Sequence, residues 1–242
     1  PYGQKIESRR LNTALARTQI APFLFPSKRF GSKSRGIAYT CPLFEFQSWT
    51  IGAHSNSLNV LLKHPEFGVR LSQKFVVLDR DGTLIEHVHY LSDPKLVTFK
   101  PDLIPALTTL SKKGFMFGVV TNQSVIGRAL ASQEEVGAVN QLIVDFLEQN
   151  DINISFLYVC PHVPEDYCKC RKPEIGLGLR AISDFNLSPP LSYVIGDQES
   201  DILFGKNLGC TPIQIQGKAK RSHLAEYYAQ SLSDAADWIL GK

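Results

Sequence analysis

Apolar runs and amphipathic segments alternate along the chain from Lys74 onwards. The runs lie at residues 75–78, 115–120, 156–159, 192–195 and 212–215, and we predict that each is a β-strand. The amphipathic segments lie at residues 102–113, 133–149, 176–185, 201–208 and 233–240, and we predict that each is an α-helix. Strands that are apolar throughout are typical of parallel sheets covered by helices on both faces. The order therefore predicts an α/β fold, a Rossmann-like three-layer sandwich around a parallel sheet.

Local signals at the ends of these segments support the predicted helices. Ser132 followed by Glu135 has the spacing of a capping box, in which each residue's side chain bonds the backbone N–H of the other. Gly114 and Gly209 stand just after predicted helices, where glycine commonly ends a helix in the left-handed conformation. These signals indicate that at least three of the predicted helices have well-defined ends.

The first seventy residues lack this alternation and differ in charge. Residues 1–70 contain ten Lys/Arg and three Asp/Glu, whereas residues 71–242 contain sixteen and twenty. We predict a poorly ordered basic extension at 1–70 and a single domain at 71–242. Two interpretations of the extension stay open, an organelle transit peptide and a segment without a role, and a folded extra domain is less favoured. A nucleic-acid partner is not expected, because the basic excess is modest and aromatic residues do not interleave with it.

The cysteine pattern and the hydropathy of the chain indicate the cellular compartment of the protein. Three of the five cysteines lie within residues 160–170, which is not a dispersed disulfide framework and indicates a reducing compartment. No apolar run reaches the ~18 residues that a membrane-spanning helix needs. We therefore expect a cytoplasmic protein without a membrane partner, with organelle import left open by the basic extension.

Two carboxylates follow the first predicted strand. Asp79 comes directly after the apolar run at 75–78, and Asp81 stands two positions later, before Gly82 and Thr83. Side chains two positions apart on an extended chain point the same way, so both carboxylates face one site. Such a pair repels, and a divalent cation or a shared proton usually relieves the repulsion. A strand end with a plain Asp-Gly turn is the alternative.

Further polar motifs follow in an order that favours a functional site over a plain turn. The second strand runs into Thr121, Asn122 and Gln123, Lys172 comes later, and another strand ends at Asp197 with Asp201 beyond it. Together with Asp-Arg-Asp-Gly-Thr at 79–83, this order resembles the haloacid-dehalogenase-like phosphohydrolases. The resemblance covers the chain from about Lys74 to the C-terminus.

The resemblance implies a mechanism and a metal. Asp79 takes the position of the nucleophile that forms an aspartyl-phosphate, and Asp81 that of the general acid/base. Mg²⁺ is implied as cofactor, held by the carboxylates of Asp79 and Asp197 and by the backbone carbonyl of Asp81. Asp201 is expected to support the loop. Thr121 and Lys172 take the positions that bind the transferring phosphoryl group.

A second metal site is predicted from spacing alone. Cys160, His162, Cys168 and Cys170 offer three thiols and one imidazole, a set that suits tetrahedral Zn²⁺ in a closed structural site. A loop with incidental thiols is the alternative. Arg171 and Lys172 follow the last ligand directly, so the zinc loop is expected to bring two cations beside the phosphate site.

These motifs together resemble the D-glycero-D-manno-heptose 1,7-bisphosphate 7-phosphatases and their relatives, the histidinol-phosphate phosphatases. Arg128 favours the former, since a guanidinium there suits a distal phosphate, although Val125 and Ala129 replace glycines usual in that family. The implied function is removal of the 7-phosphate. Histidinol-phosphate phosphatase and a catalytically idle binding module are the alternatives. The residues expected to bind substrate are Thr121, Asn122, Gln123, Arg128, Arg171 and Lys172.

The spacing between motifs also bears on the shape of the site. In the family that this chain resembles, cap modules are inserted after the first or the second motif. Residues 85–101 are all that separates the first strand from the first helix, and the second gap holds little beyond one helix. We therefore expect no large cap domain, an open active site, a small phosphorylated sugar as substrate, and a monomer.

Overall fold

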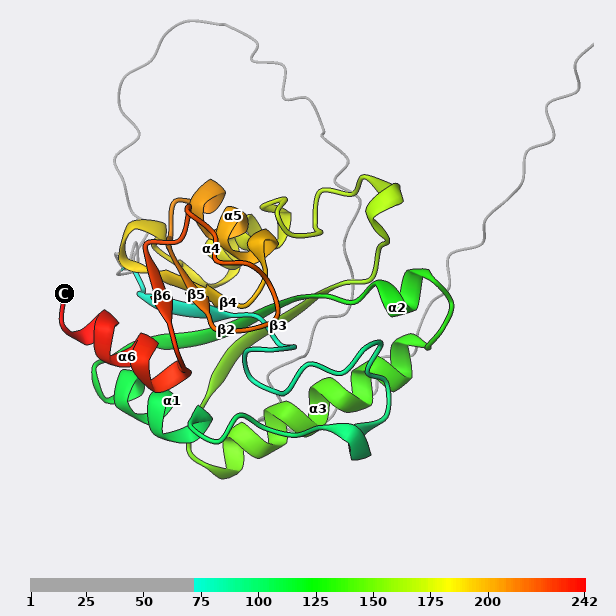
Figure 1. Cartoon of the computed structure of the whole chain (residues 1–242), viewed down its shortest axis with the longest axis horizontal. Helices are drawn as coiled ribbons and strands as arrows, with labels where there is room; N and C mark the ends of the chain where they lie inside the picture. Colours follow the sequence, from blue (N-terminus) through cyan, green and yellow to red (C-terminus); the bar gives the residue numbers. More distant parts are fainter. Residues whose placement is uncertain (1–71) are drawn as a thin grey trace, which may run out of the picture. The chain divides into compact units, whose positions relative to one another are not determined.

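A computed structural model describes residues 72–242, which form a six-stranded sheet with helices on both faces (Figure 1). The predictions made for residues 1–70 lie outside the described residues. The strands pair in the order β3-β2-β1-β4-β5-β6, and each pairing is parallel. Their bounds are β1 Phe75–Leu78, β2 Met116–Asn122, β3 Ile154–Cys160, β4 Tyr193–Gly196, β5 Thr211–Ile215 and β6 Tyr227–Ala229. In such a sheet ligands bind beyond the carboxyl ends where the order reverses, here between β1 and β4.

Helices cover the sheet in two outer layers (Figure 1). Residues of α1, α3 and α6 share a core with one face, and residues of α4 and α5 share a core with the other. The helices are α1 Leu103–Lys112, α2 Ser124–Gly127, α3 Gln133–Gln149, α4 Gly176–Phe185, α5 Glu199–Leu208 and α6 Leu232–Leu240, with 3-10 turns at Pro94–Leu96, Pro164–Asp166 and Pro189–Leu191. The predicted three-layer sandwich is confirmed.

Strand β1 shows why its apolar residues are continuous. Val76 and Leu78 pack in the core with α1, α3 and α6, whereas Phe75 and Val77 pack in the core with α4 and α5. Each of the four is at most 2% exposed. Because alternate side chains enter opposite cores, both faces of the strand must be apolar. The central position of β1 therefore carries the residue after it, Asp79, into the middle of the sheet edge.

The predicted elements are confirmed with small shifts at their ends. The capping box is present, since Ser132 accepts from the N–H of Glu135 and Glu135 accepts from the N–H of Ser132. Helix α5 begins at Glu199 rather than at residue 201, because the Asp201 carboxylate accepts the Gln198 N–H and closes an earlier turn. Strand β6 was not predicted from the sequence, because its three residues, with two half-buried tyrosines, form no apolar run.

The described part of the chain carries no cap domain between β1 and α1. Residues 79–102 contain one 3-10 turn, and an antiparallel bridge between Ile85 and Phe99 holds the connection to the body.

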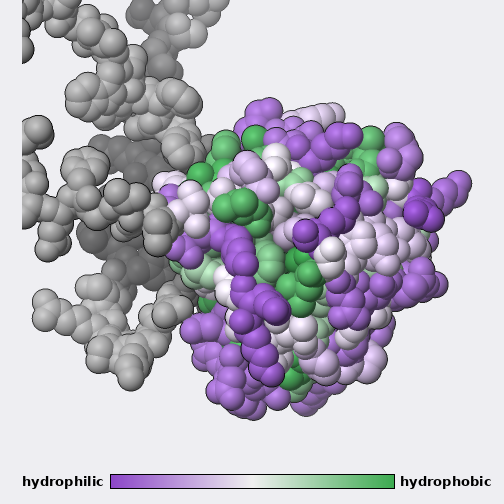
Figure 2. Space-filling view, turned by 90° about the vertical axis from the view of Figure 1, so that its left-hand side faces the viewer, coloured by the Kyte–Doolittle hydropathy of each residue, from purple (hydrophilic) through white to green (hydrophobic). Residues whose placement is uncertain are grey.

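None of the described helices combines the length and the hydropathy needed to cross a membrane. Figure 2 shows one face of the molecule, on which hydrophilic side chains surround smaller hydrophobic groups.

Candidate active site and sulfur cluster

The carboxyl ends of the two central strands bring Asp79 and Asp197 together. Asp79 follows β1, Asp197 follows β4, and the Asp79 N–H donates to the Ile195 carbonyl at 2.9 Å. Gly82 lies against Asp197 at φ +82°, and a Cβ there would stand 2.7 Å from the carboxyl carbon of Asp197. A residue with a side chain would clash and would be strained at this φ, so the turn requires glycine.

Lys172 lies between the carboxylates. Its Nζ is 2.6 Å from Asp79 Oδ1 and 2.7 Å from Asp201 Oδ1, and it donates to the Val120 carbonyl at 2.6 Å. Burial alone would lower the pKa of Lys172, but the two carboxylates outweigh it and raise the pKa. The lysine is therefore held as a cation beside Asp79.

The Asn122 side chain holds the backbone of Lys172, which lies 50 positions further along the chain. The Asn122 side chain accepts the Lys172 N–H at 3.0 Å and donates to the Lys172 carbonyl at 3.0 Å. Its amide is thus bonded to backbone, although Asn122 was expected to bind substrate. The predicted neighbourhood of Lys172 and Asp79 agrees with the structure.

Negative charge exceeds positive charge at this edge of the sheet. Oxygens of Asp79, Asp197 and Asp201 lie within 4.8 Å of one another. Burial, opposed by Lys172, raises the pKa of Asp79 to about 7, and burial together with Asp201 raises the pKa of Asp197. Asp197 Oδ2 accepts from Gln198 at 2.6 Å, whereas its buried Oδ1 has no hydrogen-bond partner among the described residues. An unpartnered carboxylate oxygen in an acidic cluster suits a hard divalent cation.

Asp201 differs from Asp197 in that both of its oxygens are used. Oδ1 pairs with Lys172 at 2.7 Å, and Oδ2 accepts the Gln198 N–H at 3.0 Å. This geometry agrees with the expectation that Asp201 supports the loop.

Asp81 is bonded by a side chain that follows β2. Gln123 Nε2 donates to Asp81 Oδ2 at 2.8 Å and to Thr121 Oγ1 at 2.8 Å. Gln123 is 5% exposed and Thr121 is 1% exposed, so their side chains form part of the wall. Gln123 was expected to bind substrate, and the structure places its amide on the predicted acid/base.

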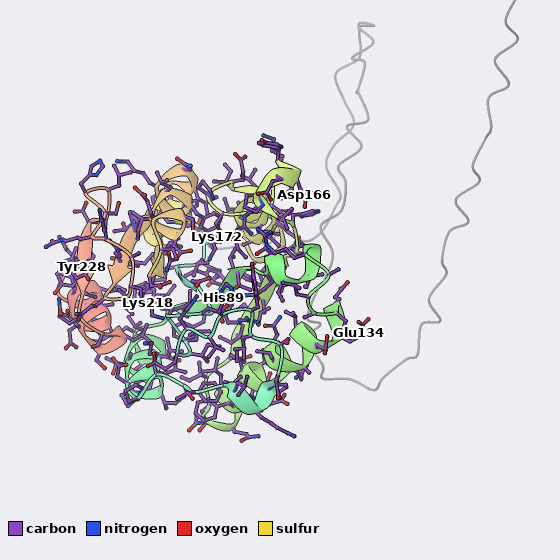
Figure 3. All side chains as sticks on the ribbon, turned by 45° about the vertical axis from the view of Figure 1, so that its right-hand side comes forward. His89, Glu134, Asp166, Lys172, Lys218 and Tyr228 are labelled. Carbon is purple, nitrogen blue, oxygen red and sulfur yellow. The ribbon has the colours of Figure 1, made fainter. Side chains whose placement is uncertain are left out.

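A cavity of about 430 Å³ joins these residues. Of the predicted site residues, its lining includes Asp79, Asp81, Thr121, Asn122, Gln123, Arg171, Lys172 and Asp197. Sequence reasoning missed His87, His89 and Tyr90, which also line it. Figure 3 shows His89 and Lys172 in the same central region of the molecule. The position of the three missed residues is the sequence signal that could have located them. They lie just after the first motif, in a segment without a cap.

The two predicted arginines differ in position. Arg171 lines the cavity and donates from Nη1 to the His162 carbonyl at 3.1 Å, so it links the cavity to the zinc-loop segment. Arg128 is exposed at the end of α2 and is not among the residues that line the cavity.

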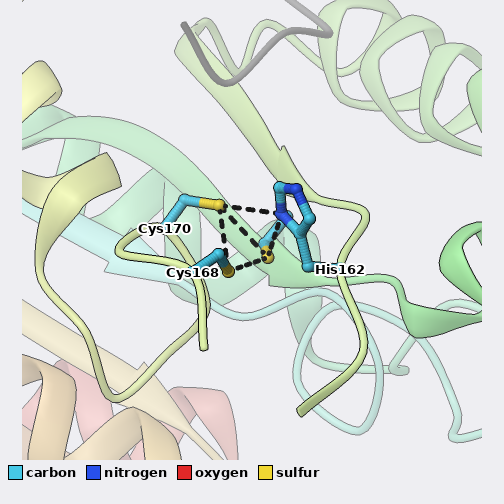
Figure 4. A group of neighbouring side chains, drawn as sticks. His162, Cys168 and Cys170 are labelled. Atoms are coloured by element: carbon cyan, nitrogen blue, oxygen red, sulfur yellow. Dashed lines mark hydrogen bonds between the residues drawn. The ribbon is translucent and has the colours of Figure 1, made fainter. Parts of the chain in front are cut away.

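The four residues predicted to bind zinc lie together (Figure 4). Cys170 Sγ is 3.4 Å from the sulfurs of Cys160 and Cys168 and 3.2 Å from His162 Nδ1, and Cys160 Sγ is 3.6 Å from each of the other two. A tetrahedron with Zn–S bonds of about 2.3 Å has sulfur–sulfur edges of about 3.8 Å. The cluster is close to this size, so its donor set and its dimensions fit a tetrahedral metal ion.

The chain is similar in sequence to known phosphatases. Residues 169–237 match the HAD-hydrolase-like family model. A protein of Thermoplasma volcanium named probable D-glycero-D-manno-heptose-1,7-bisphosphate 7-phosphatase is 38% identical over 125 residues, which cover 52% of this chain and 86% of that protein. The chain belongs to the haloacid-dehalogenase-like phosphatases. The residues of the phosphatase that match the family model lie within the described part of the chain.

Two further proteins are similar to this chain, one in sequence and one in structure. The histidine biosynthesis bifunctional protein HisB of Legionella pneumophila is 34% identical over 169 residues, and the phosphatase spans 46% of that protein and 68% of its own length. A crystal structure of D,D-heptose 1,7-bisphosphate phosphatase from B. bronchiseptica, complexed with magnesium and phosphate, superposes with a TM-score of 0.64 at 22% identity. It covers 70% of this chain and 99% of that chain. At this identity the superposition demonstrates the shared fold.

Proposed function

We propose that the phosphatase removes the 7-phosphate of D-glycero-D-manno-heptose 1,7-bisphosphate through an aspartyl-phosphate on Asp79. The observation that carries the substrate is the 38% identity to the Thermoplasma volcanium protein of that name over 86% of its length. The presence of Asp79, Asp81 and Lys172 in one cavity lining, with Lys172 paired to Asp79, supports the chemistry.

In the first step, an Asp79 oxygen attacks phosphorus and the bond from phosphorus to the leaving sugar oxygen breaks. Asp81 gives its proton to that oxygen, so the sugar leaves as an alcohol. Lys172, 2.6 Å from Asp79 Oδ1, stabilises negative charge on the transferring group. In the second step, Asp81 takes a proton from water, the water oxygen attacks phosphorus, and the bond to Asp79 breaks.

Mg²⁺ is proposed as the cation of the acidic cluster. Asp79, Asp197 and the Asp81 carbonyl would hold it, and the unpartnered Oδ1 of Asp197 supports this assignment. When bound, the ion supplies positive charge to the phosphoryl oxygens and relieves repulsion among the carboxylates. The excess of buried acids over the single lysine favours a divalent ion.

Zn²⁺ is proposed for Cys160, His162, Cys168 and Cys170, with a structural role. All four protein ligands would close the coordination shell, which leaves no position for substrate. Cys160 ends β3 beside Asn122, and Arg171 follows Cys170, so the ion would hold the segment that enters the active site. The donor set and the distances between the ligands support this role.

The second phosphate of the substrate needs a cation far from Asp79. Arg171 lines the cavity and is half-buried, which favours it for this contact. The sequence predicts the same role for Arg128, which lies outside the residues that line the cavity. His87 and His89 offer further donors along the wall.

Histidinol phosphate is a second candidate substrate, because the HisB protein of Legionella pneumophila is 34% identical over 169 residues. Purified protein with Mg²⁺ should be offered heptose 1,7-bisphosphate, the 1-monophosphate and histidinol phosphate, with phosphate release measured for each. We expect the highest kcat/KM for the bisphosphate and retention of the 1-phosphate. Preference for histidinol phosphate would replace the proposal with the alternative.

A further inference from the structure

A fully buried arginine lies beside the general acid/base. Arg80, between the two catalytic aspartates in sequence, is 0% exposed and is among the largest fully buried side chains of the described residues. An arginine is almost never buried without a partner, because the charged guanidinium loses its hydration. Its role therefore has to be sought in the groups that it contacts.

Arg80 contacts an acid on one side and an amide on the other. Its Nε and Nη2 lie 3.0 and 2.9 Å from Asp81 Oδ2, and its Nη1 donates to Asn140 Oδ1 at 2.8 Å. Asn140 is 0% exposed on α3, in line with the buried Val136, Val139 and Ile143. A polar residue in this apolar stripe has no packing advantage, and the bond to Arg80 accounts for it.

The two carboxylate oxygens of Asp81 differ in how many donors contact them. Oδ2 lies 3.0 and 2.9 Å from the Arg80 nitrogens and also accepts from Gln123 at 2.8 Å, whereas Oδ1 accepts from Arg80 Nη2 at 3.1 Å. Oδ2 is thereby occupied by rigid donors. Oδ1 keeps more of its acceptor capacity, and the Asp81 side chain as a whole is 17% exposed.

We propose that Arg80, held by Asn140 of α3, is a positioning residue that fixes the Asp81 carboxyl so that Oδ1 exchanges the proton in both steps. The inference rests on the proposed phosphatase chemistry. Oδ1 gives a proton to the leaving oxygen as the phosphorus–oxygen bond breaks, and takes one from water as the aspartyl-phosphate is cleaved. The guanidinium bonds both oxygens of the Asp81 carboxylate and acts on the substrate through that carboxylate.

Leaving-group dependence separates this role from a general structural one. Nitrophenolate leaves without a proton, so p-nitrophenyl phosphate needs Asp81 for the second step alone, whereas β-glycerol phosphate needs it for both. For Arg80→Met with Mg²⁺ we expect a burst of about one equivalent of nitrophenolate, slow turnover afterwards, and loss of ~100-fold or more in glycerol phosphate hydrolysis. Asp81→Asn should give the same pattern. Arg180→Met, which removes an ion-paired arginine from α4, should leave both reactions unchanged.

A proportional loss of burst and turnover on both substrates, or no loss, would overturn the proposal. If Arg80→Met does not fold, Asn140→Asp provides the test of the proposal. Aspartate keeps the shape of the buried residue, and its carboxylate draws the Arg80 guanidinium toward residue 140. This variant should reproduce the burst with a smaller loss, ~10-fold on glycerol phosphate, and unchanged kinetics would contradict the role of α3. A burst that persists in Asp79→Asn would instead refute the aspartyl-phosphate of the proposed function.

Discussion

The acidic centre and the sulfur cluster lie at the same edge of the sheet but are organised differently. The acidic centre draws Asp79, Lys172 and Asp201 from distant parts of the chain, and each already has partners in the protein. The sulfur cluster draws on residues 160–170 alone, and its members lie mainly against one another. The fold therefore preorganises the acidic centre, whereas the proposed zinc ion would hold the cluster together.

The chain runs directly from the sulfur cluster into the acidic centre. Arg171 and Lys172 follow the last thiol of the cluster directly, and Arg171 also bonds the carbonyl of His162. Disruption of the cluster should therefore disturb the acidic centre by displacing Lys172. Changes in the acidic centre should leave the cluster intact, and the predictions below test this asymmetry.

The largest effect is expected for Asp79→Asn, which should abolish turnover because the amide is no longer a carboxylate nucleophile. Phosphate release from the best substrate measures it, and zinc content measured by elemental analysis should stay at about one ion per chain. Activity within about tenfold of the wild type, a barrier change of only ~1.4 kcal/mol, would exclude covalent catalysis through Asp79.

Cys170→Ser should affect both regions. Loss of a buried thiolate ligand should release zinc, lower the melting temperature and lower activity, because the segment that carries Lys172 loses its anchor. Cys210→Ser is the matched control, since Cys210 is also buried but lies outside the cluster. Zinc loss with unchanged activity and melting temperature would mean that the regions are independent.

Arg171→Ala should weaken kcat/KM for the bisphosphate by ~2–3 kcal/mol, the cost of losing a charge-assisted contact. Hydrolysis of a simple monophosphate should hardly change, because it has no distal phosphate. Arg128→Ala provides the comparison, and we expect a smaller effect because Arg128 is not in the cavity lining. A larger effect of Arg128→Ala would restore the role that the sequence predicts for it.

Without magnesium, stability should depend on pH through the acidic centre. Burial raises the pKa of Asp79 from 3.8 to about 7, so the fold favours its neutral form. That contribution is complete below pH 3.8 and is lost as pH rises through about 7. The melting temperature should therefore fall between pH 5 and 8 by ~2–4 °C for each kcal/mol lost, and Asp79→Asn should flatten this dependence. Magnesium should oppose the fall, and an unchanged slope in Asp79→Asn would contradict the assignment.

The smallest effect is expected for deletion of residues 1–70. The predicted site residues and the two groups of candidate metal ligands found among the described residues lie downstream, within residues 72–242. Phosphatase activity and zinc content should be unchanged, as measured on the shortened protein beside the full chain. A collapse of activity would show that the deleted part contributes to the folded domain.

The sequence alone determined the elements and the order of the reactive groups. Apolar runs and helical spacing located β1, α3 and α4, because burial on one face or two leaves a periodic trace in a single segment. Strand ends located Asp79 and Asp197, because parallel strands present their carboxyl ends at one edge. The thiols and the imidazole were found because their spacing is local.

Tertiary structure decided what each polar side chain does. Asn122 bonds Lys172 across 50 positions and Arg80 bonds Asn140 across 60, pairings that no local period records. His87 and His89 entered the cavity lining, and Arg128 did not, because these positions depend on how loops pack after the sheet has formed. The physical reason is that hydrogen bonds and ion pairs act over a few ångströms of space, whereas sequence patterns report burial along one segment.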